Sequence, residues 1–349
     1  MAVGRSTGSV TRVPMPRRSD PGSNQATDID LDLSGKPLSP EEVSNLAATL
    51  RSTSDLRSLN LASCRLKPEG IRAITLAAAS SPTLQTLILD GNVWGDENWE
   101  PVTHLLELNT LSQLHIDCET STDTNIDTEF HAFCTALKGN TGLRQLVLGH
   151  QDHELSLSTD QEKWLSDSLA ENRSLENFGI HHLNALGADG SRLSIPSGLH
   201  RNSGLQTVCI RGFNFNAQDA GVLVGLLNNP NSPVSRLTLY GGWPDRRAAS
   251  QVMQAAIDNM NLRSFKYSPA LTLDDKEKAK ALQATLTRNQ RLPLAAGNAV
   301  HFLCQRSHHK LVEDMVQELR TTFEHNTNGR TLAAVVEAAF NGHEPPPFV

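Results

Sequence analysis

The stretch Leu56-Arg57-Ser58-Leu59-Asn60-Leu61 has leucine at its first, fourth and sixth positions, and Leu84-Gln85-Thr86-Leu87-Ile88-Leu89 has the same spacing. Successive stretches of this kind begin 27 to 32 residues apart. A period of this length is typical of solenoids, in which one supersecondary unit stacks on the next. Six further stretches place apolar residues at the same positions: Leu111/Leu114/Ile116, Leu143/Leu146/Leu148, Leu175/Phe178/Ile180, Leu205/Val208/Ile210, Val234/Leu237/Leu239 and Leu262/Phe265/Tyr267.

Each repeat is predicted to contain one strand and one helix. The second and third apolar residues lie two positions apart, so in an extended chain they face one side while the residue between them faces the other. Amphipathic segments with helical spacing follow, for example residues 69–79 and 217–228. In the fifth repeat, residues 186–202 contain three glycines and one proline, so we expect a short or broken helix there.

Polar residues mark where these helices begin and end. A side-chain oxygen can accept a hydrogen bond from an open first-turn amide at Ser39, Ser158, Asn216 and Thr272, which are predicted helix starts. Asparagine tolerates the left-handed backbone conformation that turns a chain out of a helix. We therefore predict that helices end near Asn109, Asn140, Asn172, Asn202, Asn228 and Asn289.

Stacking of the repeats predicts the fold class. Neither element can bury its apolar side alone, so the strands should form one parallel sheet and the helices a layer on one side of it. A helix is wider than the strand spacing, so the stack should curve into a horseshoe. The prediction is an α/β solenoid with a concave parallel sheet, convex helices and a C-terminal helical cap.

At this point the chain resembles leucine-rich-repeat proteins of the ribonuclease-inhibitor-like subclass, whose long repeats pair a strand with a full helix. The resemblance covers about residues 28–291. The Asn or Cys that this family has eight residues after the first leucine is present as Cys64 and Asn92. Later repeats depart from the pattern, with Gln151, Leu183, Phe213 and Gly242 at that position.

The predicted organisation has four parts. Residues 1–27 form a disordered leader, and residues 28–291 form the solenoid of about eight to nine repeats. Residues 292–343 are expected to be helical and to cap the apolar edge of the last repeat, with a separate activity as the alternative. Leu292-Pro293-Leu294 is interpreted as an aborted ninth repeat, and residues 344–349 as an extended tail.

The leader has the composition of an unfolded segment. It holds four arginines, one acidic residue and many Ser, Thr, Pro and Gly residues, and it lacks the apolar stretch of a secretory signal. Such a leader ahead of a repeat array resembles bacterial type III secreted effectors, which implies secretion into a host cell. A plain tail in a cytoplasmic protein and an organelle transit peptide remain the alternatives.

Composition excludes several function classes. A net charge of −7 and a pI near 6.0 argue against general affinity for nucleic acid or anionic membrane, and no apolar run is long enough to cross a bilayer. Five scattered cysteines without a CxxC pair favour a reducing compartment over a disulfide framework. His131 and Cys134 lack a second ligand pair, so packing is expected there and no metal.

No catalytic motif is present, since the chain has no Walker loop, no GxSxG and no HExxH. We therefore predict no enzyme activity, no cofactor and no small-molecule substrate. Two alternatives are kept open. One is an adaptor or enzyme of ubiquitin ligation, although Cys304 lacks the nearby Asp of bacterial ligases. The other is a cytoplasmic regulator of a small GTPase.

A non-catalytic protein-binding scaffold is the predicted function, with the concave face as the binding surface. A wall of fixed strands binds a partner with little ordering cost, and its charge selects the partner's orientation. Arg, Tyr and Trp are the usual anchors of interfaces, although Trp243 has the alternative of filling the loop after its strand. The predicted partner-binding residues are His115, Asp117, His181, Arg211, Arg236, Tyr240, Trp243 and Lys266.

Overall fold

The strands form a single parallel sheet. A computed structural model describes residues 29–95, 98–117, 124–149, 157–181, 195–229, 231–268 and 276–305. Within these ranges, nine strands lie side by side in chain order, and each neighbouring pair is parallel. The strands are β1 Ile29–Asp32, β2 Leu56–Asn60, β3 Thr86–Ile88, β4 Gln113–Ile116, β5 Gln145–Leu148, β6 Asn177–His181, β7 Thr207–Asn214, β8 Arg236–Gly242 and β9 Ser264–Tyr267.

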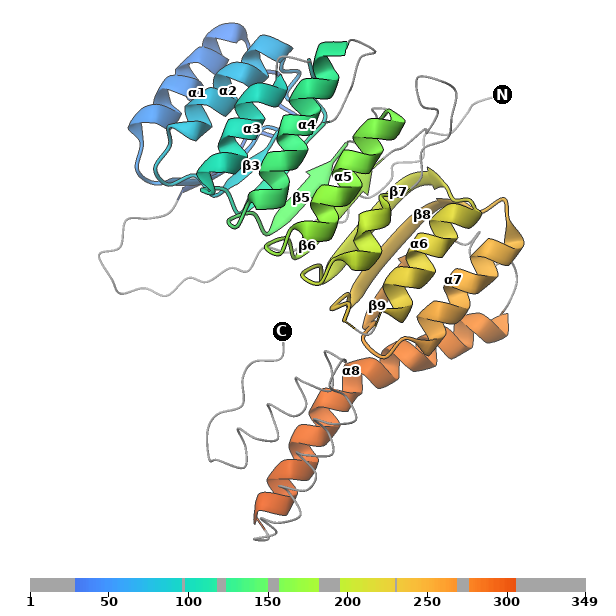
Figure 1. The fold of residues 1–349 in the computed structure, drawn as a ribbon. Helices are drawn as coiled ribbons and strands as arrows, with labels where there is room; N and C mark the ends of the chain where they lie inside the picture. The colour runs from blue at the N-terminus through green and yellow to red at the C-terminus, as the bar shows by residue number, and fades with distance from the viewer. Residues whose placement is uncertain are drawn as a thin grey trace, which may run out of the picture.

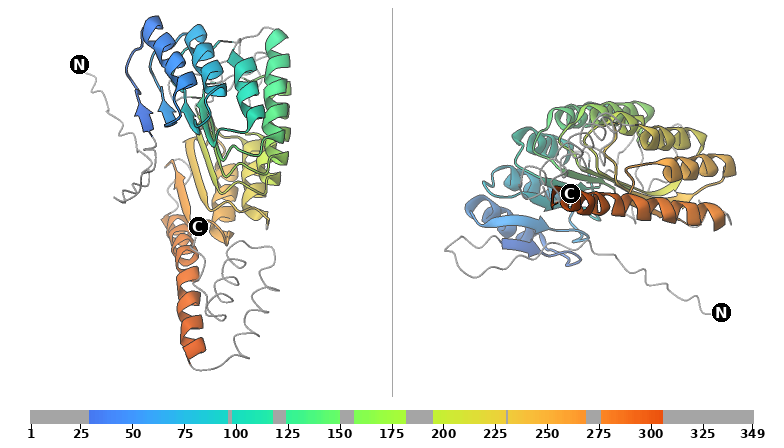
Figure 2. Two further views of the ribbon diagram at one scale, coloured as in Figure 1. Left: turned by 90° about the vertical axis from the view of Figure 1, so that its left-hand side faces the viewer. Right: turned by 90° about the horizontal axis from the view of Figure 1, so that it is seen from below.

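Helices cover one face of the sheet, and the other face lines the inside of an arc (Figure 1, Figure 2). The predicted α/β solenoid with a concave parallel sheet is confirmed. The helices of the described ranges are α1 Pro40–Ser52, α2 Pro68–Ala79, α3 Trp99–Leu108, α4 Thr124–Gly139, α5 Thr159–Glu171, the 3-10 helix η2 Ser197–Arg201, α6 Ala217–Asn228, α7 Arg246–Asp258 and α8 Lys276–Gln305.

The apolar positions of the repeat form the core between the sheet and the helices. The second apolar residue of each repeat lies next to its counterpart in the neighbouring strand, as Leu87 does to Leu59 and Leu114. All of these side chains from β2 to β8 are 0–1% exposed. The core is therefore one continuous column of stacked side chains, as the repeat pattern predicts.

Three of the four predicted helix starts are confirmed. At each one, the capping side chain accepts a hydrogen bond from a first-turn amide, and the side chain three residues later bonds back to the capping residue. The pairs are Ser39 with Glu42, Ser158 with Gln161 and Asn216 with Asp219. Thr272 lies outside the described residues.

The asparagines at the helix ends have a different role from the one predicted. Asn109 is left-handed, with φ 55°, but Asn172, Asn202 and Asn259 have extended backbones with φ between −64° and −73°. The prediction from backbone conformation is therefore wrong for Asn172 and Asn202, and the helix end predicted near Asn289 is wrong because α8 continues past it. The side chains of these asparagines, and not their backbone conformation, hold the neighbouring repeats together.

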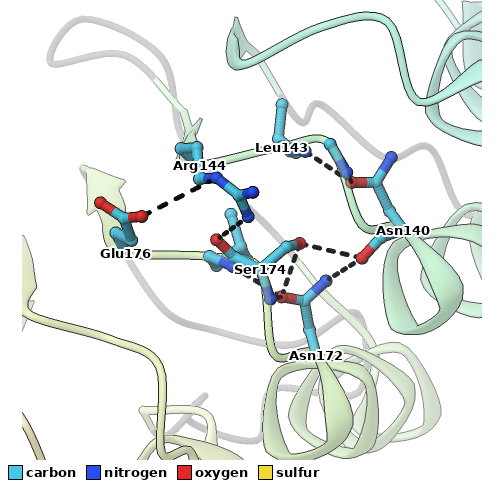
Figure 3. A network of polar contacts seen from close by, with 8 residues as sticks. Asn140, Leu143, Arg144, Asn172, Ser174 and Glu176 are labelled. Carbon is cyan, nitrogen blue, oxygen red and sulfur yellow. Dashed lines mark hydrogen bonds and ion pairs between the residues drawn. The ribbon is translucent and has the colours of Figure 1, made fainter.

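From Asn140 onward, buried and half-buried side-chain amides link a repeat to the one before it. The Asn172 amide group donates to the carbonyl oxygens of Leu137 (2.7 Å) and Asn140 (3.2 Å) in the preceding repeat. Its oxygen accepts from the backbone amides of Ser174 and Leu175, just before β6 (Figure 3). We call this series the asparagine ladder; its members are Asn140, Asn172, Asn202, Asn229, Asn259 and Asn289.

The last described helix differs from its prediction. α8 runs without interruption through the predicted boundary at residue 292, and Leu292-Pro293-Leu294 lies within it and not in a ninth strand. Its beginning packs on α7, and its second half extends beyond the sheet (Figure 1). The leader, residues 306–343 of the predicted cap and the tail lie outside the described residues.

The fifth repeat has the short helix expected from its glycines and proline, since its described part contains only η2, a five-residue 3-10 helix. Its neighbours α5 and α6 pack on either side of it. Among the helices of the described ranges, none has both the length and the apolar composition needed to span a bilayer.

The asparagine ladder makes a testable prediction. Asn172 is 0% exposed, so Asn172→Ala leaves several buried backbone groups unpaired, each worth about 1–3 kcal/mol. We expect this variant to lose roughly 3 kcal/mol or more of unfolding free energy, measured by urea denaturation. Asn45→Ala, at an exposed position of α1, is the control and should change stability by no more than about 0.5 kcal/mol. Equal stability of the two variants would contradict the structural role of the ladder.

Candidate functional site

The sheet register places the side chains of the concave face, here called the inner wall, in three rows. The first row runs across the strands as Gln113, Gln145, Asn177, Thr207, Arg236 and Ser264. The second runs as His115, Val147, Gly179, Cys209, Thr238 and Lys266. The third contains His181, Arg211 and Tyr240.

Three cations and one aromatic ring gather at the C-terminal end of the wall. Arg211, Arg236 and Lys266 are exposed, on neighbouring strands. The guanidinium carbon of Arg211 lies 5.5 Å from the centroid of the Tyr240 ring, which is 40% exposed. Such a cation–π contact contributes about 0.5–1 kcal/mol at an exposed site. We call Arg211, Arg236, Tyr240 and Lys266 the basic patch.

A bulge in β7 follows directly after the basic patch. The register shifts between Arg211 and Phe213, and Gly212 between them has φ 83°, a conformation that favours glycine. Beyond the bulge, β7 and β8 continue to pair as far as Asn214 and Gly242. Arg211 and Tyr240 are thus held side by side on the longest strand pair of the described sheet.

A fourth cation next to the patch was not among the predicted residues. Burial and the positive charge of Arg236 lower the pKa of Arg263 from its usual range. Arg263 precedes β9, and its backbone amide donates to the carbonyl of Ser235, just before Arg236. Arg263 occupies a repeat position that the strand alternation does not assign to the wall, so the sequence pattern gave no signal for it.

The middle of the wall is neutral. His115 and Gln145 are joined by a hydrogen bond of 2.7 Å between their Nε2 atoms, and Val147 and Gly179 form a buried floor beside them. Burial lowers the pKa of His115, although the nearby Asp90 carboxylate opposes the shift. His115 is therefore neutral at pH 7.

A thiol and an imidazole lie next to each other between the middle of the wall and the basic patch. The Sγ atom of Cys209 is 3.7 Å from Nε2 of His181. Burial raises the pKa of Cys209, and the opposing effects of Arg211 and Lys266 are smaller. The thiol is therefore protonated at neutral pH and is a weak nucleophile.

The N-terminal end of the wall is acidic. Asp30 and Asp32 are exposed on β1, and Asp90 is half-buried just after β3. Asp117 was expected to face a partner, but it is 1% exposed, and its Oδ2 atom accepts from the backbone amides of Gly91 and Asn92. Asp117 therefore fixes the turn after β3 and is not presented by the wall.

Trp243 is also withdrawn from the surface. It is 4% exposed, and its ring stacks on Phe215 with centroids 4.4 Å apart. Trp243 therefore fills the loop after its strand, as the alternative interpretation predicts. Of the predicted partner-binding residues, the wall presents His115, His181, Arg211, Arg236, Tyr240 and Lys266.

The described residues contain no evident metal site. In the part of the chain that the structure describes, His, Cys, Asp and Glu side chains form no cluster of three or more suited to a metal ion. Cys134 is 2% exposed in the core, and the ring of His131 packs 4.6 Å from that of Trp164. The inner wall thus offers charges, hydrogen-bonding groups and one exposed ring, which are the chemistry of non-covalent recognition.

Comparisons with known proteins give weak similarities. No protein-family model matches the chain, and neither does any curated protein. Leiomodin-1 actin-binding site 2 is similar in structure, with a TM-score of 0.32 and 11% identity over 55% of this chain and 89% of that one. The tropomodulin C-terminal domain of Caenorhabditis elegans has a TM-score of 0.33 and 12% identity, over 57% and 97%. The architecture described above rests on the register and hydrogen bonds of this chain.

The half-buried His115 of the wall predicts a pH effect on stability. Because the pKa of His115 is lowered in the folded state, the unfolded state binds this proton first as the pH falls, so stability is lost below the usual histidine range. His115→Gln removes this contribution, and its thermal midpoint should fall less between pH 7.5 and 5.5 than that of the wild type.

The matched control for this experiment is His104→Gln, because His104 is exposed on α3. That variant should keep the wild-type dependence of the thermal midpoint on pH. If His115→Gln and the wild type lose stability in parallel, burial of His115 has no effect on stability.

Proposed function

We propose that this chain is a non-catalytic scaffold that captures a protein partner on its inner wall. The observation that carries the proposal is the basic patch, in which Arg211 lies over the exposed ring of Tyr240 and two further exposed cations, Arg236 and Lys266, lie on the same strand and the next one. Arginine and tyrosine dominate the binding energy of protein interfaces. Fixed neighbouring strands hold these side chains, so a partner orders little of the wall when it binds.

Binding without turnover agrees with the chemistry of the wall. A catalytic thiol requires a lowered pKa, whereas burial raises that of Cys209. Tyr240 and the three cations of the patch suit contact with carboxylates, phosphates and backbone carbonyls. The proposal therefore includes no cofactor, no metal and no small-molecule substrate. Turnover by the purified chain, such as ubiquitin conjugation lost in Cys304→Ala or stimulated GTP hydrolysis by a small GTPase, would overturn it.

We further propose that the chain is a ribonuclease-inhibitor-like repeat protein that a bacterial type III system delivers into a host cell, where it binds a host protein. Repeats of 27 to 32 residues with full helices support the subclass. The Arg-, Ser- and Pro-rich composition of residues 1–27 supports delivery, and a cytoplasmic location is the alternative. Residues 1–27 fused to a reporter should be exported by cells with a working secretion system and retained by cells without one. If neither kind of cell exports the reporter, the proposed delivery is wrong.

The basic patch makes a direct prediction. The double change Arg236→Ala and Tyr240→Ala should reduce the amount of partner retained in pull-downs from host lysate by at least about tenfold, because two anchors are removed. Both side chains are exposed, so the thermal midpoint should stay within a few degrees of the wild-type value. Retained proteins are identified by mass spectrometry.

Lys163→Ala is the matched control, since Lys163 is an exposed cation on α5 in the helix layer. This control should retain the same proteins as the wild type. If the double variant retains them equally well, the basic patch is not the binding site.

A further inference from the structure

Charge is segregated along the solenoid. Residues 29–194 carry 24 Asp and Glu against 11 Lys and Arg, a net charge of −13. Residues 195–305 carry 6 Asp and Glu against 12 Lys and Arg, a net charge of +6. The whole-chain net charge of −7 conceals this separation, and the field of the molecule changes sign from one end of the arc to the other.

The inner wall has the same polarity as the whole body. At its beginning, Asp30 and Asp32 are exposed and Asp90 is half-buried. The described wall positions on β7, β8 and β9 contain cations and no acid, and the strands between carry neutral side chains. A ligand that lies along the wall therefore meets an acidic end, a neutral middle and a basic end.

We propose that the inner wall binds one polypeptide segment of mixed charge in a single direction, with the acidic part of the segment on the basic patch and its basic part near Asp30, Asp32 and Asp90. This inference rests on the proposed function and narrows its partner class. Reversing the segment would bring like charges together at both ends, and such juxtapositions suppress binding across an interface. The wall thus selects direction as well as composition.

The geometry of the sheet sets the distance between the two charged parts. Five strand spacings separate β3 from β8, and seven separate β1 from β8; each spacing is about 4.8 Å, so the two charged parts of the partner should lie about 24 to 34 Å apart. About 16 to 22 residues of helix or about 7 to 10 residues of strand span this distance. A single secondary-structure element of the partner is long enough.

A nucleic acid fits this polarity poorly. Its phosphates continue at regular intervals, so a strand anchored on the basic patch and lying along the wall would bring negative charge against the acidic strands. Two copies of the chain cannot dock wall against wall, because two concave surfaces cannot approach each other closely (Figure 2). A convex polypeptide element with opposite charges at its ends satisfies both conditions.

The test uses three fluorescein-labelled synthetic peptides and fluorescence anisotropy at low salt, where exposed charges act strongly. The block peptide has four Lys, an eight-residue Gly/Ser linker and four Glu. The shuffled peptide has the same composition with Lys and Glu alternating, and the third peptide has only the linker and four Glu. The centres of the two charged blocks are about 12 residues apart, which gives a root-mean-square separation of roughly 19 Å, and the flexible linker can extend to the required spacing.

The wild type should bind the block peptide at least about fivefold more tightly than either other peptide. The double change Arg236→Glu and Lys266→Glu should abolish this preference. The control Lys163→Glu and Lys280→Glu alters net charge equally at exposed positions of the helix layer and should keep it. Equal affinity for block and shuffled peptides overturns the inference, as does loss of the preference in the control.

An oligouridylate probe separates the two classes of macromolecule. Tighter binding of oligouridylate than of the block peptide, with competition between them, would assign the basic patch to nucleic acid and overturn the inference. Failure of the inference is distinguishable from failure of the proposed function. A chain that captures a host protein through Arg236 and Tyr240 but shows no preference for the block peptide remains a scaffold, without directional selection.

Discussion

Hydrogen bonds between neighbouring repeats set the register of this solenoid; they come from the backbone of the parallel sheet and, from Asn140 onward, also from side-chain amides of the helix layer. The last carbonyl groups of a helix have no partner within the helix. The backbone amides just before the next strand also need a hydrogen-bond acceptor. Asn172 satisfies both at once, since it donates to the preceding repeat and accepts from the chain that enters β6. Leucine stacking alone permits sliding between repeats, because apolar contact is non-directional. Hydrogen bonds of fixed length remove that freedom.

Fixed register turns positions that are distant in the sequence into neighbours on the wall. Arg211 and Tyr240 are 29 residues apart in the chain, yet they are paired across β7 and β8 and form a cation–π contact. The same register puts the imidazole of His115 within 2.7 Å of the Gln145 amide. Neither contact involves a side chain of the apolar core. The wall is therefore a surface whose chemistry can vary while the stack beneath it stays the same.

The sequence predicts the repeat, the core and the helix starts, because these follow from local periodicity and capping that each repeat contains in full. It does not predict why asparagine ends the helices, since the reason is a bond to the preceding repeat and not a backbone preference. The prediction that Asp117 and Trp243 face a partner is wrong for a related reason. The strand pattern predicts on which side of the sheet a side chain lies, but not whether a neighbouring turn or aromatic ring of the preceding repeat covers it. The local sequence also did not predict that α8 continues without interruption through Pro293.

The basic patch concentrates positive charge on three adjacent strands. Arg211 lies on β7, Arg236 on β8 and Lys266 on β9, and the described wall positions of these strands contain no acid that would offset them. Burial, together with the positive charge of Arg236, lowers the pKa of Arg263 next to the patch. Exposed cations that contribute nothing to the core are typical of a binding surface. The carboxylates of an acidic partner supply at binding the neutralisation that the fold does not provide.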